Sequence, residues 1–381
     1  SKILTVDADG KGSLVSEADL MSKIFSTVDR KPDDLAALLY TSGTTGRSKG
    51  AMLTQNNLLS NAKTLKKLWQ VTKSDILIHA LPIFHTHGLF VALNTAMLAG
   101  AKVNFIPKFD IDEIIETLHA STLLMGVPTF YTRLLADYRL TEKLTKNMRL
   151  FISGSAPLLS ETHEEFTKRT GHHILERYGM TETNMITSNP YHGERRPGTV
   201  GTPLADVQMK ITDPETGKEM GKGEIGMIEV RGPNVFKGYW NMPDKTALEL
   251  RGTGYFVTGD LGKLSSDGYL SIVGREKDLI ISGGYNVYPK EVEDILNELN
   301  QIDETAVFGI PDNDLGERVV AAIVLESNKN FNQSKTEVFV NEKLARYKQP
   351  KEYFVLDSLP RNSMGKVQKN ELRKRFSSSD I

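Results

Sequence analysis

Short apolar runs alternate with amphipathic segments through the first half of the chain, and this alternation limits the possible fold more than any other feature. Residues 35–43, LAALLYTSG, predict a buried strand that runs into a glycine-rich loop, and residues 52–69 predict the helix after it. Further strands are predicted at 75–84, 102–109 and 148–158, and a helix at 112–119. The alternation is typical of layered α/β sheets, in which reactive groups gather at the carboxyl ends of the strands.

The pattern changes near Asp206. Short strands separated by Gly, Asp and Pro turns predict a small antiparallel, barrel-like subdomain over residues 205–277. After it, an α+β pattern is predicted, with helices at 290–299 and 335–344 and strands at 304–311, 319–326 and 352–357. We therefore expect a large domain over residues 1–277 and a small domain over residues 278–381, with the boundary near Lys277 to Leu279.

Composition excludes several classes of function. The 47 Lys and Arg residues nearly balance the 48 Asp and Glu residues, so the net charge is −1 and no basic field is available for nucleic acid or an acidic membrane. No cysteine is present, which removes disulfides, thiolate metal sites and cysteine nucleophiles and favours a reducing, cytoplasmic setting. The most apolar stretch, residues 88–101, is too short to span a membrane, and the first residues do not resemble a signal peptide.

The strongest local signal is YTSGTTGRSKG, residues 40–50. Its glycines allow a close approach of the backbone, its hydroxyl groups donate hydrogen bonds and its lysine adds a cation, a combination that suits a polyphosphate. A Walker A loop is excluded, because Arg47 and Ser48 separate Gly46 from Lys49. We predict a phosphate-binding loop, and the alternative is a flexible turn.

Eight ordered blocks, this loop included, resemble the adenylate-forming superfamily of acyl-CoA synthetases, luciferases and peptide-synthetase adenylation domains. The other seven begin at residues 81, 153, 176, 197, 255, 274 and 360 and read LPIFHTHG, SGSAPL, ERYGMTE, PGTVGTPL, YFVTGD, GREKDLIISGGYNVYPKEVE and PRNSMGKVQK. The resemblance implies a large domain of layered α/β sheets followed by a small, mobile α+β domain. Only about forty residues precede the phosphate loop, fewer than is usual in the family, so we expect part of the large domain to be absent.

The resemblance also implies an ATP site. The residues that would hold the β- and γ-phosphates are Thr41, Ser42, Gly43, Thr44, Thr45, Gly46 and Lys49. Those that would hold the nucleoside are Ser155, Ala156, Pro157, Tyr178, Asp260 and Arg275, with the Tyr178 ring facing adenine and the Asp260 carboxylate accepting from the ribose hydroxyls.

Catalytic roles are implied for three residues. Thr181 would contact the α-phosphate, and Glu182 would support Mg²⁺ as a hard oxygen ligand. Lys366, beside Gly365, would bridge the substrate carboxylate and the α-phosphate, where charge accumulates in the transition state.

A hinge is implied at Asp278. After the adenylate forms, the small domain would turn there, withdraw Lys366 and present Gly283 and Gly284, which let the pantetheine arm of CoA pass close to the backbone. The alternative is that Asp278 only caps the following segment.

The acid to be activated is suggested by Arg177. A buried guanidinium near the reacting carboxylate demands an anion, because an unpaired buried charge is costly, and a second carboxylate on the substrate would supply one. The blocks at 81–94, 176–185 and 234–246 look closest to malonyl-CoA synthetases. We expect Arg177 to read the distal carboxylate of malonate, with His85 and Met180 near the acyl cavity and His87 acting only in packing. The alternative is that Arg177 pairs with Glu176 or another acid and only shapes the loop.

The expected activity is ATP-dependent ligation of malonate to coenzyme A through a malonyl-adenylate, which gives malonyl-CoA, AMP and pyrophosphate and requires Mg²⁺. The expected partners are these small molecules, not nucleic acid or a membrane. Two alternatives stay open. One is a CoA ligase for another short acid, such as methylmalonate or a monocarboxylic acid, and the other is a nucleotide-binding remnant without turnover.

Overall fold

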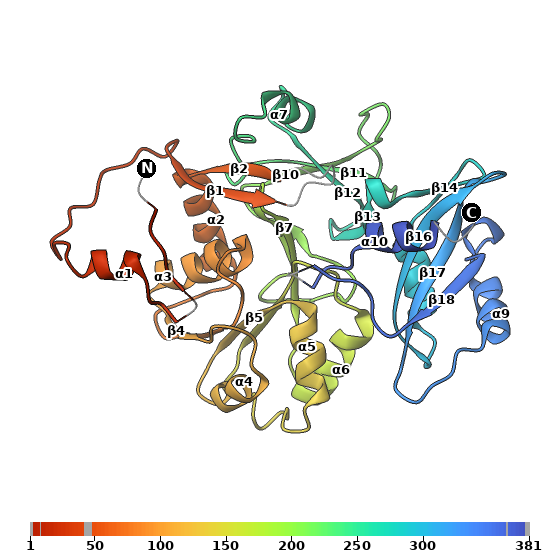
Figure 1. Ribbon diagram of the computed structural model, residues 1–381, viewed down its shortest axis with the longest axis horizontal. Helices are drawn as coiled ribbons and strands as arrows, with labels where there is room; N and C mark the ends of the chain where they lie inside the picture. Colours follow the sequence, from red (N-terminus) through yellow and green to blue (C-terminus); the bar gives the residue numbers. More distant parts are fainter. Residues whose placement is uncertain (1–2, 8, 42–47, 363–364, 378–381) are drawn as a thin grey trace.

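The computed structural model describes residues 3–7, 9–41, 48–362 and 365–377 (Figure 1). It is a mixed α/β structure with a large N-terminal part and a small C-terminal part that contains β16, β17 and β18, at the right of Figure 1. The predicted fold class is therefore confirmed. No helix among the described residues is both long and apolar enough to cross a membrane.

A seven-stranded sheet forms the centre of the large part. Its strand order is β4-β3-β5-β6-β7-β8-β9, and the pairs from β4 to β7 are parallel while β7, β8 and β9 pair antiparallel. All residues of β5 and β6 are buried, as is usual for parallel strands packed on both faces. The strands are β3 (Ile76–His79), β4 (Lys102–Phe105), β5 (Leu123–Gly126), β6 (Leu150–Ser153), β7 (Leu175–Met180), β8 (Asn184–Ser188) and β9 (Thr202–Pro203).

Helices connect these strands and begin at recognisable caps. The Thr54 hydroxyl accepts a hydrogen bond from the backbone of Asn57, and the Asn57 side chain accepts one from the backbone of Thr54, which starts α2. The Asp110 carboxylate caps α4 in a similar way. The helices of the large part are α1 (Ser13–Ala18), α2 (Gln55–Leu68), the π-helix η1 (His87–Leu93), α3 (Asn94–Ala99), α4 (Ile111–Leu118), α5 (Pro128–Ala136), α6 (Ser160–Thr170) and α7 (Pro243–Glu249).

The strand predicted before the glycine-rich loop forms as β1 (Leu35–Thr41), but the prediction that it is buried is wrong. It pairs only with β2 (Lys49–Thr54), in a two-stranded sheet. Alternate side chains therefore face different surroundings: Leu39 packs on the core, whereas Leu38 and Tyr40 keep 40% and 63% of their surface exposed. Apolar sequence favours a strand, but burial also requires a second layer. Residues 42–47 of the predicted loop lie outside the described residues.

Several predicted elements differ in length; the strands expected over 102–109 and 148–158, for example, end at Phe105 and Ser153. The helix expected from Met52 starts only at Gln55, because β2 includes the first three residues of that segment. The strand expected over 75–84 ends at His79, and the chain then leaves the sheet toward η1. Residues 80–86 are thereby placed at the carboxyl edge of the sheet.

A four-stranded antiparallel sheet follows, in the order β10-β11-β12-β13. The predicted antiparallel strands are confirmed, but the sheet is open and does not close into a barrel, since its end strands β10 and β13 do not pair with each other. Four strands are too few to curl around a filled interior. The strands are β10 (Gln208–Thr212), β11 (Gly226–Arg231), β12 (Phe256–Leu264) and β13 (Leu270–Arg275).

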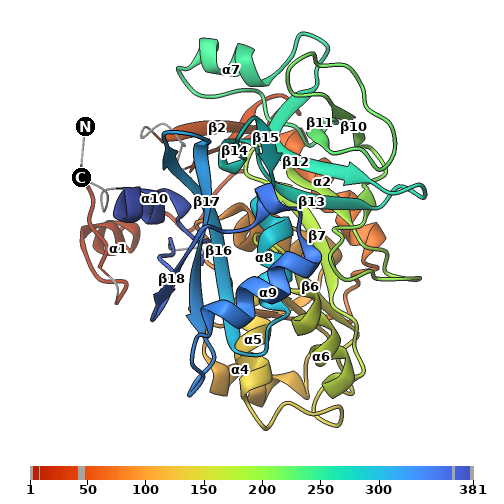
Figure 2. The same ribbon diagram turned by 90° about the vertical axis from the view of Figure 1, so that its right-hand side faces the viewer.

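The small part is the predicted α+β arrangement around a five-stranded sheet (Figure 2). Alternate residues of β16 and β17 belong to different apolar clusters: Val307 packs with residues of α8 and α9, and Phe308 packs with Leu372 of α10. The elements are η2 (Glu276–Asp278), β14 (Ile280–Ser282), β15 (Tyr285–Val287), α8 (Pro289–Asn297), β16 (Ile302–Asp312), β17 (Gly316–Leu325), α9 (Gln333–Lys343), η3 (Arg346–Lys348), β18 (Glu352–Leu356) and α10 (Lys369–Ser377). A domain boundary near Asp278 stays a prediction.

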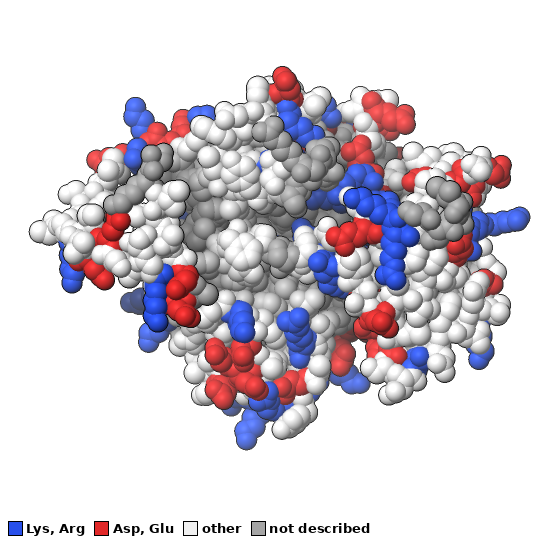
Figure 3. All heavy atoms as spheres, in the orientation of Figure 1, with Lys and Arg blue, Asp and Glu red and all other residues white. Residues whose placement is uncertain are grey.

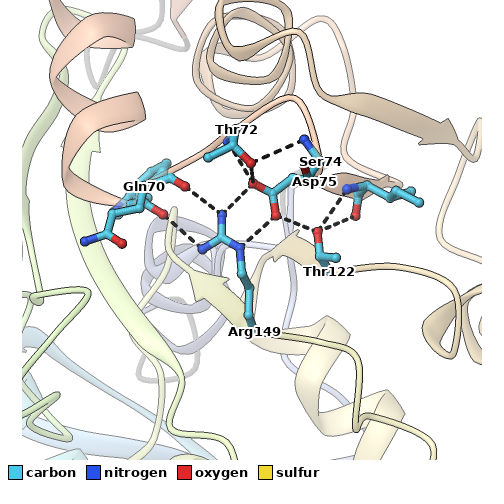
Figure 4. Close-up of polar contacts among 8 residues, drawn as sticks. Gln70, Thr72, Ser74, Asp75, Thr122 and Arg149 are labelled. Carbon is cyan, nitrogen blue, oxygen red and sulfur yellow. Dashed lines mark hydrogen bonds and ion pairs between the residues drawn. The ribbon is translucent and has the colours of Figure 1, made fainter.

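An ion pair closes the amino edge of the large sheet (Figure 4). Arg149 donates through Nε and Nη2 to the two oxygens of Asp75, at 2.7 Å each. Its Nη1 and Nη2 atoms also donate to the carbonyls of Trp69 and Gln70. The Thr122 hydroxyl donates to Asp75 at 2.8 Å. Burial alone would raise the pKa of Asp75, but these hydrogen bonds lower it to about 2. The pair ties the starts of β3, β5 and β6 to the end of α2.

Replacing Asp75 by Asn removes the counter-ion of Arg149, and we expect the free energy of unfolding to fall by about 3 kcal/mol in urea unfolding. The matched control is Asp112→Asn, because the ion pair of Asp112 with Arg139 is largely exposed and should contribute less than about 1 kcal/mol. In the wild type, this contribution is complete above the ordinary pKa of 3.8 and is lost as the pH falls toward 2. Equal decreases in the free energy of unfolding for Asp75→Asn and Asp112→Asn would contradict a larger contribution from the Asp75–Arg149 pair.

Candidate functional site

The carboxyl ends of β3, β6 and β7 carry most of the residues singled out in the sequence. Residues 85–87 follow β3, residues 154–157 follow β6, and β7 itself runs into residues 181–182. Figure 3 shows a hollow in the middle of this face, with basic side chains gathered on the side where α10 lies. Parallel sheets commonly place a ligand at this edge.

Arg177 lies on β7 and is 2% exposed. Its Nε and Nη2 atoms find no hydrogen-bond partner among the described residues. The alternative pairing with Glu176 is not formed: that carboxylate lies beside His163 at 3.4 Å, because successive residues of a strand point to opposite faces. Burial lowers the pKa of Arg177 to about 9, so the guanidinium is still charged at neutral pH.

The end of β6 is shaped to pack against this guanidinium. A Cβ atom at Gly154 would lie 2.5 Å from Cζ of Arg177, so a side chain there would displace the guanidinium from its present position. Ser155 adopts a left-handed conformation, with φ of 73°, and its hydroxyl lies 3.2 Å from Nδ1 of His87. Strain of this kind is common at binding sites.

His87 makes a polar contact with Ser155 in addition to its packing. It is 3% exposed, and its Nε2 atom has no hydrogen-bond partner among the described residues. Burial, and then the charge of Arg177, lowers its pKa well below the usual value and keeps the ring neutral. His85 is less buried, and burial together with the charge of Lys366 lowers its pKa too. Buried polar atoms normally have partners, so these three side chains mark a place for a polar ligand.

Three residues predicted for the nucleoside meet where β7, β12 and β13 come together. Asp260, 6% exposed, accepts a hydrogen bond from the Tyr178 hydroxyl at 2.5 Å and pairs with Nε of Arg275 at 2.7 Å. Asp260 and Arg275 are cross-strand partners in the antiparallel sheet. The use of the Tyr178 hydroxyl was not anticipated from the sequence, which suggested only a role for its ring. Ala156 and Pro157 follow Ser155 at the same edge.

Lys366 reaches this region from the small part. The Asn362 amide donates to the Lys366 carbonyl and the Lys366 amide donates to the Asn362 side chain, at 3.0 Å each. Arg361 donates to the Gly365 carbonyl at 2.6 Å. The side chain keeps solvent-exposed surface. Even so, loss of surrounding water, and then the charge of Arg275, lowers its pKa, while two carboxylates nearby oppose the shift.

Glu182 lies in the turn after β7 and is 4% exposed. Burial raises its pKa, and the hydroxyl of Tyr239 donates to its Oε1 atom at 2.9 Å. No group of three His, Cys, Asp or Glu side chains that could hold a metal ion occurs in the described part of the chain. A single carboxylate fits Mg²⁺ nevertheless, because this ion is often held by one or two carboxylates together with substrate phosphates.

The predicted hinge residue and the two glycines are also placed. The Asp278 carboxylate accepts from Arg373 of α10 at 3.0 Å, which links the segment between the two parts to the last helix. Gly283 and Gly284 form the turn between β14 and β15 with φ of 57° and 79°. Met180 is half-buried against the core, and Thr181 is half-buried beside it. The roles of these residues remain predictions.

Two side chains at this edge were missed in the sequence. Tyr239 and Glu249 both contact Lys49. Lys49 is the last of the residues predicted to hold the β- and γ-phosphates. Tyr239 lies within the segment 234–246 that was compared with other proteins, but no spacing indicates that a tyrosine hydroxyl meets two carboxylates. The arrangement depends on contacts between residues almost 200 positions apart.

Comparisons with known proteins agree with this geometry. Residues 2–240 match the family described as AMP-binding enzyme, and residues 291–366 match its C-terminal domain. The malonate–CoA ligase of Arabidopsis thaliana is 40% identical over an alignment of 379 positions that covers 91% of this chain and 62% of that protein. The chain thus spans less than two thirds of the length of this relative.

Solved structures of MatB from Rhodopseudomonas palustris are also similar. The ATP-bound form is 55% identical, covers 99% of this chain and 75% of its own, and superimposes with a TM-score of 0.97. The apo form has the same identity and coverage but a TM-score of 0.82. The arrangement of this chain is therefore closer to that of the ATP-bound protein.

The unpaired state of Arg177 can be tested through stability. Arg177→Met removes a buried charge without a partner, so we expect the free energy of unfolding to stay constant or to rise by about 1 kcal/mol. Arg149→Met is the control, since it strands Asp75 and should lower the free energy by about 3 kcal/mol. Urea unfolding without ligand measures both. A loss at Arg177 as large as the loss at Arg149 would show that Arg177 has a partner in the free protein.

Proposed function

This chain belongs to the AMP-binding enzyme family, and on that premise we propose that it joins malonate to coenzyme A through a malonyl-adenylate. The observation that carries the proposal is the unpaired Arg177 guanidinium at the carboxyl edge of the sheet. The malonate–CoA ligase of Arabidopsis thaliana supports it as a relative.

Arg177 selects for a dicarboxylate by electrostatics. Its guanidinium can donate two parallel hydrogen bonds to one carboxylate, and burial makes that interaction strong because water does not compete. A malonate bound in this way would offer its other carboxylate for reaction, with neutral His87 and His85 as further polar neighbours. A monocarboxylic acid would leave the guanidinium unpaired, which costs free energy.

In the first half-reaction, an oxygen of the free carboxylate attacks the α-phosphorus of ATP and the bond to pyrophosphate breaks. Lys366 would neutralise charge on the carboxylate and the α-phosphate, Thr181 would donate to the α-phosphate, and Lys49 would hold the outer phosphates. Asp260, with Arg275 and Tyr178, would orient the ribose. Mg²⁺, when bound by Glu182, would neutralise phosphate charge.

In the second half-reaction, the thiol of CoA attacks the acyl carbon and AMP leaves. We propose that the small part turns at Asp278 between the two steps, so that Lys366 withdraws and Gly283 and Gly284 approach the adenylate. The Arg373 contact of Asp278 would have to break in this motion. A division into domains of residues 1–277 and 278–381 follows from the same proposal.

Two other functions remain as alternatives. A ligase for methylmalonate or a short monocarboxylic acid would follow the same mechanism, but Arg177 would have a role other than binding the distal carboxylate of malonate. A nucleotide-binding remnant would bind ATP without turnover. A cytoplasmic setting, suggested by the absence of cysteine, stays a prediction.

The proposal is tested by pyrophosphate release from MgATP with malonate, methylmalonate, acetate or butyrate, each with and without CoA. We expect release with malonate that CoA increases, because thiolysis regenerates the free enzyme. Release that prefers a monocarboxylic acid would overturn the malonate assignment and keep the mechanism. ATP binding without release for any acid would favour the remnant.

Arg177→Ala separates the substrate role from the chemistry. We expect kcat/KM for malonate to fall about 100-fold, because a charge-assisted bidentate contact is lost. The low rate with acetate should change little. Arg231→Ala, at an exposed arginine on β11, is the control and should retain the malonate rate. A malonate preference that survives Arg177→Ala would contradict the assignment.

Lys366→Ala tests the reach of the small part into the site. We expect adenylate formation, measured by malonate-dependent pyrophosphate exchange, to fall at least about 100-fold because charge stabilisation is lost, while ATP binding in calorimetry persists. Malonyl-AMP supplied directly should still be converted by CoA. Lys335→Ala on α9 is the control. Unchanged exchange would remove Lys366 from the mechanism.

A further inference from the structure

Lys49 is held by two groups in the described structure. Its Nζ atom lies 3.1 Å from the Tyr239 hydroxyl and 3.3 and 3.4 Å from the two oxygens of Glu249. It also lies 4.3 Å from the centre of the Tyr239 ring, a cation–π contact. The side chains of Lys49 and Glu249 are only 16% and 21% exposed, so this ion pair is partly shielded from water.

Backbone hydrogen bonds fix Tyr239 between Lys49 and Glu182. The segment 237–240 pairs with β2, the strand that begins at Lys49, through bonds between Met52 and Gly238 and between Gly50 and Trp240. The same segment is tied to the turn that carries Glu182 by the bond from the Phe236 amide to the Glu182 carbonyl at 2.8 Å. Tyr239 thus connects the phosphate loop and the carboxylate assigned to Mg²⁺.

The Tyr239 hydroxyl faces more acceptors than it can serve. It lies 2.9 Å from Glu182 and 2.5 Å from Glu249, yet it has one proton to donate. Lys49 donates to the hydroxyl oxygen and to Glu249, and so supplies the positive charge that this group of carboxylates requires. Movement of Lys49 toward a ligand therefore affects both carboxylates.

We propose that Tyr239 and Glu249 form a resting site for Lys49, which Lys49 must leave when a nucleoside triphosphate binds. Glu249 then competes with the β- and γ-phosphates for the lysine, and Tyr239 is the positioning residue that keeps Lys49 and Glu182 within reach of each other. This inference rests on the proposed function, in which Lys49 holds the outer phosphates.

The exchange is feasible because Glu249 does not lose its last cation. Lys245, one turn earlier on α7, pairs with Glu249 at 2.8 Å and stays when Lys49 leaves. The Tyr239 hydroxyl also remains as a donor. The cost to be overcome is therefore that of a partly buried ion pair, and phosphate oxygens with more negative charge can replace it.

Calorimetric titration with ATP and with AMP, in the absence of Mg²⁺, tests the proposal. AMP lacks the outer phosphates and should not sense Lys49. We expect Glu249→Gln to bind ATP about fivefold more tightly and AMP unchanged, since a competing carboxylate is removed. Asp244→Asn is the control, because it removes one negative charge from the exposed start of the same helix and should change neither affinity more than about twofold.

A double-mutant cycle distinguishes competition for Lys49 from simple repulsion of the phosphates. In a Lys49→Gln background, Glu249→Gln should no longer tighten ATP binding. If it tightens ATP binding there as much as in the wild type, the carboxylate acts directly on the nucleotide and the proposal is overturned.

Tyr239→Phe keeps the ring and removes the hydroxyl. We expect ATP to bind about fivefold more weakly and the Mg²⁺ concentration that gives half-maximal ATP binding to rise, with AMP binding unchanged. Tyr255→Phe, at a hydroxyl 3.4 Å from Gln208 on the surface of the antiparallel sheet, is the control. Unaltered ATP and Mg²⁺ affinities would overturn the role of Tyr239.

The outcomes separate this inference from the proposed function. If the wild type binds neither ATP nor AMP, the proposed function and the resting site are both overturned. If it binds both nucleotides and neither Glu249→Gln nor Tyr239→Phe changes the ATP affinity, only the resting site falls. Thermal unfolding of each variant shows whether a loss of affinity comes from a loss of fold.

Discussion

The charge of Arg177, buried on β7 without a counter-ion in the described chain, is the condition on which the rest of the site depends. An isolated buried charge is expensive, so the fold must be stable enough elsewhere to hold it. Glycine at position 154 leaves the guanidinium the space that a side chain would occupy, and Ser155 beside it has a left-handed backbone conformation. The free protein thus keeps a charge ready for an anion.

The opposite edge of the same sheet solves the same problem differently. Arg149 directly precedes β6 and is neutralised by Asp75, and it also donates to backbone carbonyl groups. That pair joins the starts of three strands. One end of the sheet is therefore closed by paired charges, and the other end keeps a charge unpaired. This polarity agrees with the rule that parallel sheets bind ligands at their carboxyl edge.

The candidate site is completed by elements that are distant in sequence. β7 contributes Tyr178, the antiparallel sheet contributes Asp260 and Arg275, and the small part contributes Lys366. Each group changes the electrostatic surroundings of the others, as the lowered pKa of Lys366 indicates. The greater similarity to the ATP-bound than to the apo form of MatB fits an arrangement in which the small part faces the nucleotide edge.

Local apolar periodicity and ordered motifs were enough to predict the family and several elements, among them β3, β6 and α4, because such patterns depend on neighbours along the chain. Other elements, such as β5, α5 and α6, were not predicted. Contacts between distant segments left β1 half-exposed, kept the antiparallel sheet open and left Arg177 without Glu176 as a partner. The tertiary structure also brought Tyr239 and Glu249 to Lys49, which lies about 200 residues away. Burial and charge pairing are properties of surfaces that meet in space, and no local pattern carries that information.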